Sequence, residues 1–558
     1  MIPFDDRGAF HPVAEGSELR RLAVRSAGAT ISGTGATTAI QVASTVVLSR
    51  LLAPADFGIV AMVTTFSLLL SNFGLNGFTE AVIQCKEIDR RTASNLFWIN
   101  LGAGLVLAGA FAASGSLLAQ FYRNPLVANA AVGTSVAILV SKGGVIHLAL
   151  LRRGMRFAAV SANLAVARGA NAIITILLAL LGWRYWALVA GLVAQQLSMA
   201  VGAWWLCRWL PSWPKRTGRT GPVIRFAAST YGLFCFKYAT QNVDNLLVGW
   251  QFNAIALGFY KRAYDLFVLS QNELVGPLHN VALATFSRLN HDQVRFKRYL
   301  VSSLAMLAFV GMAVGADMAL VGRDFIRLVL GPQWGEAGKI FSFFGPGIGI
   351  MLLYSTTGWI HLSIGKPNRW LRWSIIEFCV TALLFVLALR WGPQGIAAAW
   401  SVSFWLLIIP AFWYAAKPIR LQVSLLISAV WKYALASLLT AAACVALTRK
   451  LLPIPSTATA VGALEHMVFT SGLFLALYLG AVIVLHRGVG PLRQLANLLR
   501  ELGPKGRSAH RTDISLATAA ATAPAAAPAA VAGRTLGVSA TENAPLALQT
   551  RQPERQET

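Results

Sequence analysis

Ionisable and amide side chains occur inside stretches of the chain that are otherwise apolar. The stretch 226–250 contains Lys237, Gln241, Asp244 and Asn245. Residues at i, i+4 and i+7 share one face of a helix, so the first three form a single stripe. An ionisable group inside a bilayer costs free energy unless it meets a cavity or a partner. Two interpretations are open: the stripe lines a water-filled cleft, or a Lys–Asp pair joins two helices.

Three further ionisable residues lie in neighbouring apolar stretches. Arg168 is a candidate phosphate ligand, with snorkelling to the membrane surface as the alternative. Arg262 lies near one end of the stretch 254–287, where snorkelling is again open, and Glu273 lies deeper in the same stretch. A carboxylate held inside a membrane can take part in proton exchange. We therefore expect Asp244 or Glu273 to carry any proton coupling.

The candidate cavity residues share a capacity to bind charged or hydroxyl-rich groups. They are Arg168, Lys237, Gln241, Asp244, Asn245 and Arg262. Three cations and one acid leave a net positive site, which favours a phosphate or pyrophosphate group. The amides suit sugars, because sugars offer many hydroxyl groups as hydrogen-bond partners. These residue types predict an anionic, sugar-bearing lipid headgroup as the substrate.

No arrangement of residues predicts catalysis or a tightly bound cofactor. The sequence contains no P-loop, no Ser–His–Asp arrangement and no cluster with metal-ligand spacing. Its five cysteines fit no metal motif and lie outside the predicted periplasmic loops, so we expect free, buried thiols. The connections between apolar stretches are short for a catalytic domain. We therefore expect a protein that is not an enzyme and needs no metal or cofactor.

Fourteen apolar stretches are long enough to cross about 30 Å of hydrocarbon as helices. They form sets of six, six and two: 28–51, 57–83, 95–119, 126–150, 159–182 and 185–207; 226–250, 254–287, 300–322, 325–363, 371–390 and 394–416; 425–447 and 463–486. Arginine and lysine crowd every second gap between them. Basic loops stay in the cytoplasm. The alternation predicts a bacterial inner-membrane protein with an even number of helices and both termini in the cytoplasm.

Composition indicates a membrane protein with a separate tail. Of 558 residues, 56% are hydrophobic and 13% are charged, against about a quarter charged in soluble proteins. We assign the net charge of +26 to cytoplasmic loops that meet anionic lipids, which excludes nucleic acid as the partner. The predicted divisions are a cytoplasmic N-terminal segment, a six-helix bundle, a basic linker, a second six-helix bundle, a helix pair and a disordered tail: 1–27, 28–208, 209–225, 226–416, 425–486 and 504–558.

The two six-helix blocks have features of parallel repeats. At an offset of 200 residues, four identities pair Gln41 with Gln241, Gly58 with Gly258, Leu69 with Leu269 and Asn72 with Asn272. Parallel repeats are related by an axis along the membrane normal and have a site at their interface. We therefore predict an all-α polytopic membrane protein, with about 14 transmembrane helices in two pseudo-symmetric six-helix bundles plus a C-terminal pair. Such an architecture suits alternating access.

Five stretches carry a resemblance to a known family: ADFGIVAMV, NFGLNGFTEAVIQCKEIDRRTASNLFWINLGAG, IRFAASTYG, ALGFYKRAYDL and LVLGPQWGEA. With these stretches the chain resembles the oligosaccharide flippase family of the multidrug/oligosaccharidyl-lipid/polysaccharide transporter superfamily. The likeness is to the exporter branch for colanic acid, polysaccharide and lipopolysaccharide. It covers residues 25–420 approximately, and the tail beyond 504 has no counterpart.

The resemblance implies transport of an undecaprenyl-pyrophosphate-linked oligosaccharide to the periplasmic leaflet, for exopolysaccharide or lipopolysaccharide biosynthesis. The implied partners are this polyprenyl-pyrophosphate-linked oligosaccharide, membrane lipids, a polysaccharide polymerase and chain-length proteins. Arg168 and Lys237 match the cationic cavity residues of the family by their position in a helix only. The alternatives within the superfamily are a multidrug exporter, which the excess of basic residues argues against, and a peptidoglycan-precursor flippase. From other classes, a polysaccharide polymerase or ligase and a structural scaffold are the alternatives.

Overall fold

The computed structural model describes residues 1–10, 17–85, 87–215, 220–289, 292–419, 421–450 and 459–493. Met1–Pro491 form one compact unit. Its described regular structure is helical, apart from two isolated β-bridges near the N-terminus. The predicted disordered tail, 504–558, lies outside the described residues.

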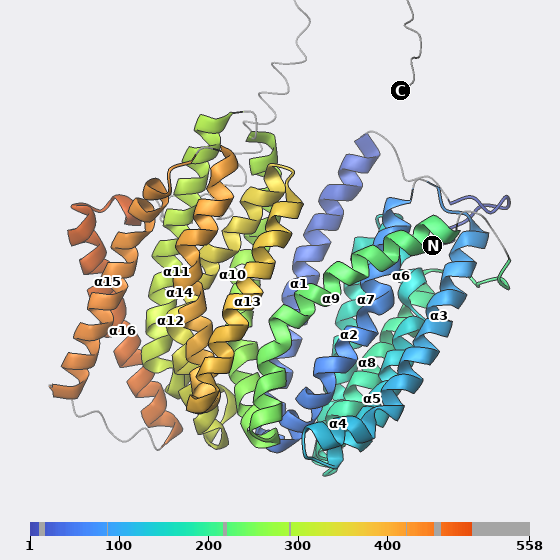
Figure 1. Cartoon of the computed structure of the whole chain (residues 1–558), viewed down its shortest axis with the longest axis horizontal. Coiled ribbons are helices and arrows are strands. Elements are labelled where there is room, and N and C mark those ends of the chain that lie inside the picture. Colours follow the sequence, from blue (N-terminus) through green and yellow to red (C-terminus); the bar gives the residue numbers. More distant parts are fainter. Residues whose placement is uncertain are drawn as a thin grey trace, which may run out of the picture. The chain divides into compact units, whose positions relative to one another are not determined.

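Eight helices form what we refer to as the first bundle (Figure 1). They are α1 (Ser17–Leu51), α2 (Pro54–Gln84), α3 (Arg90–Ala113), α4 (Gly115–Phe121), α5 (Leu126–Lys142), α6 (Val145–Arg153), α7 (Phe157–Leu180) and α8 (Tyr185–Leu206). Two predicted spans are therefore interrupted, since 95–119 divides into α3 and α4, and 126–150 divides into α5 and α6.

The interruption between α5 and α6 lies at Gly143 and Gly144. The indole N–H of Trp204 donates to the Gly143 carbonyl oxygen at 2.7 Å. A carbonyl freed at a helix end within a membrane must find such a partner inside the protein. A Cβ atom on Gly144 would lie 2.9 Å from the Cα of Ala200, so the glycine allows α8 to approach closely.

The second bundle consists of α9 to α14, and a helix pair follows it. The bounds are α9 (Thr220–Gln251), α10 (Ala254–Arg288), α11 (Gln293–Leu330), α12 (Gly335–Ser363), α13 (Pro367–Ala388), α14 (Gly392–Ala416), α15 (Val423–Lys450) and α16 (Ala460–His486). Short 3-10 turns are η2 (Pro332–Trp334), η3 (Leu389–Trp391) and η4 (Lys417–Ile419).

The predicted boundary between the ninth and tenth spans, near residue 325, is wrong. α11 continues through this point and stops at Gly331, whose φ of 108° favours glycine. Pro332 then begins η2. The charged residues near 325 do not end the helix, because Asp324 Oδ2 lies 2.7 Å from Nδ1 of His466 on α16. A partner on the neighbouring helix compensates the carboxylate within the apolar surroundings.

Ten helical stretches among the described residues are long and apolar enough to cross a membrane. One of them, 368–419, contains both α13 and α14, while α1, α9 and α10 are outside this set. Helices satisfy their backbone hydrogen bonds internally, which is what a chain in hydrocarbon requires. The chain is a multi-pass membrane protein, and the count of fourteen spans stays a prediction.

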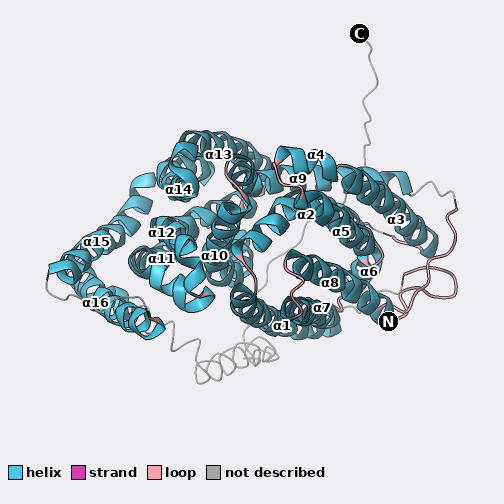
Figure 2. Ribbon diagram, turned by 90° about the horizontal axis from the view of Figure 1, so that it is seen from below, coloured by secondary structure: helices cyan, strands magenta, loops and turns pink. Residues whose placement is uncertain are grey.

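Each bundle is organised around one central helix. α2 packs on α5, α6, α9 and α10, and α12 packs on α10, α11 and α14. In the end-on view of Figure 2, α15 and α16 lie beyond α11, which is the helix that both contact. The hydroxyl of Tyr478 on α16 donates to the Phe309 carbonyl oxygen of α11 at 2.8 Å. Such hydrogen bonds associate helices in lipid, where the hydrophobic effect between helices is absent.

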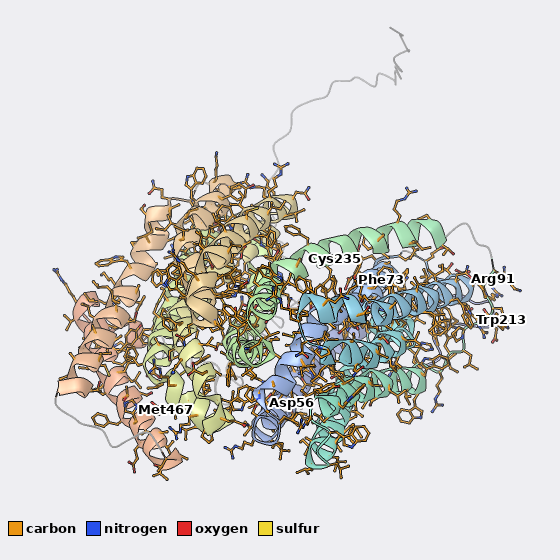
Figure 3. All side chains as sticks on the ribbon, turned by 60° about the horizontal axis from the view of Figure 1, so that its bottom comes forward. Asp56, Phe73, Arg91, Trp213, Cys235 and Met467 are labelled. Carbon is orange, nitrogen blue, oxygen red and sulfur yellow. The ribbon has the colours of Figure 1, made fainter. Side chains whose placement is uncertain are left out.

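α9 contacts both bundles. Figure 1 shows it crossing at a slant before it turns alongside the second bundle. Its first half packs on α2, where the hydroxyl of Tyr231 donates to the Leu69 carbonyl oxygen at 2.7 Å. Phe73 of α2 packs edge-on against the Tyr231 ring near this crossing. In Figure 3 the labels of Phe73 on α2 and Cys235 on α9 locate the crossing. The second half of α9 reaches α10 and α14 through Asp244.

Candidate functional site

The two bundles meet where the first turns of α2 and α10 cross. A Cβ atom on Gly58 would lie 1.6 Å from the Ala254 carbonyl oxygen, and one on Gly258 would lie 1.9 Å from the Pro54 carbonyl oxygen. The two contacts are reciprocal, because the partners correspond at the same offset of 200 residues as the predicted repeat. Only glycine permits so close an approach of two backbones. The two repeats therefore touch each other at equivalent positions.

Further contacts between the bundles lie at the same end. The indole N–H of Trp334 donates to the Ser49 carbonyl oxygen at 2.7 Å, and Arg50 Nη2 donates to the Leu328 carbonyl oxygen at 3.2 Å. The Phe57 ring packs edge-on against Trp334 with centroids 5.5 Å apart. These contacts hold the turn between α1 and α2 against the second bundle.

Arg262, a predicted cavity residue, lies in this junction. Its guanidinium carbon is 3.9 Å from the centre of the Phe57 ring of α2, and its Nη1 is 3.8 Å from an Asp265 oxygen. Lys261 forms an ion pair with the same Asp265 carboxylate. A guanidinium group over an aromatic face is stabilised by the ring quadrupole. Asp265 therefore lowers the net positive charge around Arg262 below the value expected from the predicted site residues alone.

Asp244 of α9 is fully buried between α10 and α14. Its carboxylate accepts hydrogen bonds from the Tyr260 hydroxyl at 2.7 Å, the Trp400 indole N–H at 2.9 Å and the Asn245 backbone N–H at 2.7 Å. Three hydrogen-bond donors offset part of the free-energy cost of burying this carboxyl group. In this structure Asp244 therefore joins three helices of the second bundle.

The two predicted amide ligands differ in exposure. Gln241 is exposed, and its backbone carbonyl oxygen accepts a hydrogen bond from the Tyr264 hydroxyl at 3.2 Å. Asn245 is buried, with its amide nitrogen 3.5 Å from Asn242 Oδ1. The side chain of Gln241 is the one of the two that can reach a ligand in this arrangement.

Arg168 of α7 contacts α1 in the first bundle. Its Nη1 donates to Oε1 of Gln41 at 3.0 Å. This partner is the side-chain amide of α1 that the predicted repeat pairs with Gln241. The structure thus places Arg168 beside α1 and Arg262 at the crossing of α2 and α10, in two separate sets of contacts.

For two predicted site residues, the structure describes the position in a helix but not the side chain. Lys237 is on α9 and Glu273 is on α10, but their side chains are not among those described. Their roles stay predictions. Among the described residues, no group of three or more His, Cys, Asp or Glu side chains could hold a metal ion. The five cysteines are free thiols, but the prediction that all are buried is wrong, because only Cys207 and Cys444 are.

Lys142 is a buried cation that the sequence interpretation missed. It is fully buried, and its Nζ donates to the carbonyl oxygens of Leu70 and Ser71 on α2 at 2.9 and 2.7 Å. Its side chain passes Gly104 of α3, where a Cβ atom would lie 2.3 Å from Lys142 Cγ. The signal in the sequence is a lysine within the apolar stretch 126–150. Its placement links α5 to the middle of α2.

Asp317 is a second ionisable residue that the sequence interpretation missed. The Ser471 hydroxyl of α16 donates to Asp317 Oδ2 of α11 at 3.0 Å. The signal is an aspartate within the apolar stretch 300–322. Together with the contact between Asp324 and His466, it gives α11 two carboxylates that face α16.

Comparison with protein families matches residues 47–339, more than half of the chain, to the family described as polysaccharide biosynthesis protein. The chain belongs to this polysaccharide biosynthesis protein family. This membership confirms the family resemblance of the sequence motifs.

Curated relatives of this polysaccharide biosynthesis protein carry related names. It is 23% identical to the succinoglycan biosynthesis transport protein ExoT of Rhizobium meliloti (strain 1021), over 60% of this chain and 68% of ExoT. It is 21% identical to the lipopolysaccharide biosynthesis protein WzxC of Escherichia coli (strain K12), over 52% of this chain and 59% of WzxC. It is 23% identical to the teichuronic acid biosynthesis protein TuaB of Bacillus subtilis (strain 168), over 64% of this chain and 74% of TuaB.

Solved structures establish the fold of this family member. A lipid II flippase MurJ in an inward closed conformation aligns with a TM-score of 0.65 at 14% identity, covering 82% of this chain and 98% of MurJ. An inward-facing multidrug resistance MATE family transporter of the MOP superfamily aligns with a TM-score of 0.53 at 12% identity, covering 69% of this chain and 94% of the transporter. The predicted fold class, an all-α polytopic membrane protein of two helical bundles, is confirmed.

Proposed function

We propose that this polysaccharide biosynthesis protein moves a polyprenyl-pyrophosphate-linked oligosaccharide across the bacterial inner membrane by alternating access. The observation that carries the proposal is the reciprocal crossing at Gly58 and Gly258, where the two repeats meet. A crossing made of small residues lets two rigid bundles change their angle while their backbones stay in contact. The names of the relatives support a polysaccharide precursor as the cargo, for exopolysaccharide or lipopolysaccharide biosynthesis.

The proposed orientation has both termini in the cytoplasm, because basic residues crowd every second gap between the apolar stretches. In this orientation the turn between α1 and α2 faces the periplasm. The contacts of Trp334 with Ser49 and of Arg50 with Leu328 then close the periplasmic side. Substrate enters from the cytoplasmic side in this state.

The headgroup site that we propose combines cations from both bundles. Arg168, Lys237 and Arg262 bind the pyrophosphate, and Gln241, whose side chain is exposed, binds sugar hydroxyls. Asn245 is buried in this state and joins Gln241 only in a conformation that exposes it. A guanidinium group suits this role, because it offers several N–H donors in a plane that matches phosphate oxygens. The hydrogen bond of Arg168 to Gln41 holds this guanidinium group beside α1. The polyprenyl chain stays in lipid between the bundles.

Any coupling to protons rests, in this proposal, on Asp244 or Glu273. Asp244 is held by donors from α10 and α14. A second conformation in which Tyr260 and Trp400 move away leaves a carboxylate that must bind a proton or another cation to remain in the membrane. In each transport cycle, Asp244 then alternates between a state hydrogen-bonded to Tyr260 and Trp400 and a state that binds a proton or another cation.

Transport of this kind forms and breaks no covalent bond in the substrate. The headgroup crosses the membrane with its bonds intact, so no catalytic residue, metal or cofactor is needed. A polysaccharide polymerase and chain-length proteins are the proposed partners, because they act on the repeat unit after it has crossed.

Deletion of the gene in its host tests the proposal directly. We expect polymer export to stop and lipid-linked repeat units to accumulate on the cytoplasmic leaflet. Complementation with Arg168→Gln should restore membrane protein but little export, while Lys339→Gln should restore both. Lys339 is a matched control, because it forms an exposed ion pair with Glu336 at 2.6 Å. Unchanged export in the deletion strain would refute the proposal.

A second assay distinguishes the alternatives within the superfamily. Purified protein in liposomes is given a lipid-linked repeat unit, a peptidoglycan precursor or a cationic drug. We expect flipping of the first substrate. Selective transport of the peptidoglycan precursor or of the drug would assign the corresponding alternative instead.

A further inference from the structure

Lys142 ends α5 inside the first bundle, and the proposed substrate contacts leave it unused. Its side chain is fully buried, and Nζ donates to two backbone carbonyl oxygens of α2, those of Leu70 at 2.9 Å and Ser71 at 2.7 Å. Residues 126–153 are long and apolar enough to cross a membrane, and Lys142 lies near the middle of this stretch. An ionisable group at this depth costs free energy, so we expect it to have a function.

The surroundings of Lys142 are shaped to hold its side chain. A Cβ atom on Gly104 of α3 would lie 2.3 Å from Lys142 Cγ, so a side chain at this position would displace the lysine. One turn earlier on α3, the side-chain amide of Asn100 donates to the Lys142 carbonyl oxygen at 3.0 Å. The backbone and the side chain of Lys142 are therefore both fixed, with Nζ at the carbonyl oxygens of α2.

No carboxylate of the neighbouring helices faces this lysine. The main contacts of α5 are with α2, α3, α4 and α8, and of these only α2 contains acidic residues, Asp56 and Glu80. Asp56 accepts a hydrogen bond from the Ala53 backbone N–H at 3.1 Å, at the start of its own helix. Glu80 lies about 14 Å further along α2 than Ser71 and interacts electrostatically with Arg152 of α6. Neither acid is a counter-ion for the amine.

Other groups near the amine do not supply a charge partner either. His147 of α6 is buried, with Nε2 3.1 Å from the Trp209 carbonyl oxygen, and the Tyr231 hydroxyl of α9 donates to the Leu69 carbonyl oxygen. The centre of the Phe73 ring is 5.9 Å from Nζ, at the outer limit of a cation–π contact of about 6 Å. α4 has no titratable side chain, and those of α3 and α8 lie in the first turn of each helix: Arg90, Arg91 and Tyr185.

An uncharged amine is sufficient for both hydrogen bonds of Nζ. An ammonium group has three N–H donors, whereas Nζ has two acceptors among the described residues, the carbonyl oxygens of Leu70 and Ser71. A neutral amine has two N–H donors, so it keeps both bonds. A buried charge without a counter-ion costs free energy, and this cost favours loss of the proton.

We propose that Lys142 is a proton-binding group of the first bundle, which gives up its proton in this conformation and recovers it when water reaches the amine. The step is the exchange of one proton with water. Hydronium and the neutral amine give water and the ammonium group, and no other bond forms or breaks. The site rests on the contacts of Lys142 alone.

The place of these contacts on α2 gives the proton a consequence. Leu70 and Ser71 directly follow Leu69, whose carbonyl oxygen accepts the hydrogen bond from Tyr231 of α9, so α5 and α9 hold the same stretch of α2. A movement that separates α2 from α5 exposes the amine and takes up a proton, so low pH favours the separated state. This link to transport rests on the proposed function. It makes the movement sensitive to pH and does not replace coupling through Asp244 or Glu273.

Proton uptake on unfolding tests the site without any substrate. The full chain in mild detergent is unfolded with dodecyl sulfate at pH 8, in weak buffer with a pH indicator. An unfolded lysine is an ammonium at this pH, so we expect the wild type to take up about one proton more per molecule than Lys142→Gln. Glutamine keeps two N–H donors but does not titrate. The exposed Lys339 is charged in both states, so Lys339→Gln should match the wild type. Equal uptake by the wild type and Lys142→Gln would overturn the proposal.

A second measurement uses the folded protein and needs no stable Lys142 variant to fail. In protein with isotope-labelled lysine, the NMR chemical shift of Nζ distinguishes an amine from an ammonium group. We expect an amine signal at pH 8 in the wild type that persists in Lys237→Gln and is lost in Lys142→Gln. Absence of any amine signal from the folded wild type would overturn the proposal, as would its loss in Lys237→Gln. Both measurements are independent of the cargo, so a failed transport proposal leaves this test intact.

Discussion

The indole N–H of Trp400 on α14 and the carboxylate of Asp244 on α9 are hydrogen-bonded across 2.9 Å. Trp400 is also stacked on Phe404, with ring centroids 5.5 Å apart. The position of α14 therefore depends on a buried carboxyl group of α9. Because both groups are buried, neither can exchange its partner for water without a change in helix packing.

Trp400→Phe should destabilise the second bundle. The ring still fills the space in part, but Asp244 loses one of its donors, which costs about 1–3 kcal/mol for a buried acceptor. We expect a lower melting temperature in detergent. Trp405→Phe is the control, because the Trp405 indole donates to the Pro346 carbonyl oxygen at 3.0 Å from an exposed position. Equal melting temperatures of the two variants would contradict this role of Trp400.

Gly58→Val should stop transport while the protein remains in the membrane. Its Cβ would lie 1.6 Å from a backbone oxygen that cannot move independently, so α2 and α10 must separate. Such overpacking costs about 1–3 kcal/mol or more. The measurement is polymer export per membrane-inserted protein. Gly102→Val on α3 should export normally, since nothing lies within 4 Å of a Cβ at Gly102.

Lys142→Met should weaken the link between α5 and α2. Methionine keeps most of the volume beside Gly104, but it cannot donate to the carbonyl oxygens of Leu70 and Ser71. We expect a loss of about 1–3 kcal/mol in stability, read as a lower melting temperature. Lys215→Met changes an exposed lysine and should have little effect. A Lys142→Met protein as stable as the control would show that the two hydrogen bonds contribute nothing net.

Cys207 should react with maleimide only at unusually high pH. Burial raises the pKa of the Cys207 thiol to about 12, because the thiolate is penalised away from water. An ordinary thiol with a pKa near 8.5 is mostly thiolate at pH 9, whereas Cys207 stays protonated. Labelling at Cys207 should therefore keep rising with pH above 10, or appear on unfolding. Lys215→Cys in the same loop should level off near pH 9, and parallel profiles would contradict this burial.

Of the features of the fold, the repeat is predicted from the sequence in most detail, down to individual residues. The match of Gly58 with Gly258 at a fixed offset depends on sequence alone, and both residues lie at the crossing of the two bundles. The helix end near 325 is not predictable in the same way. Charged residues suggest an end there, but the chain turns at Gly331, where a positive φ is available, and His466 compensates Asp324 from a distant part of the chain.

The candidate site is predictable as a set of residue types and not as a set of contacts. The position of Asp244 on α9 is readable from helical spacing, but its donors come from α10 and α14, 16 and 156 residues further along the chain. Lys142 and Asp317 carry the same signal as Asp244, a charge within an apolar stretch. Their partners are backbone oxygens and a serine of other helices, which no local pattern specifies.

The two carboxylates of α11 that face α16 make the end of the helical region costly to remove. Asp317 and Asp324 meet Ser471 and His466 from α16. A protein cut short before this last helix would leave both acids without these partners in an apolar region of the chain. Loss of the final helices, by a premature stop codon or by proteolysis, would thus leave an unstable protein that is degraded, and not a smaller functional transporter.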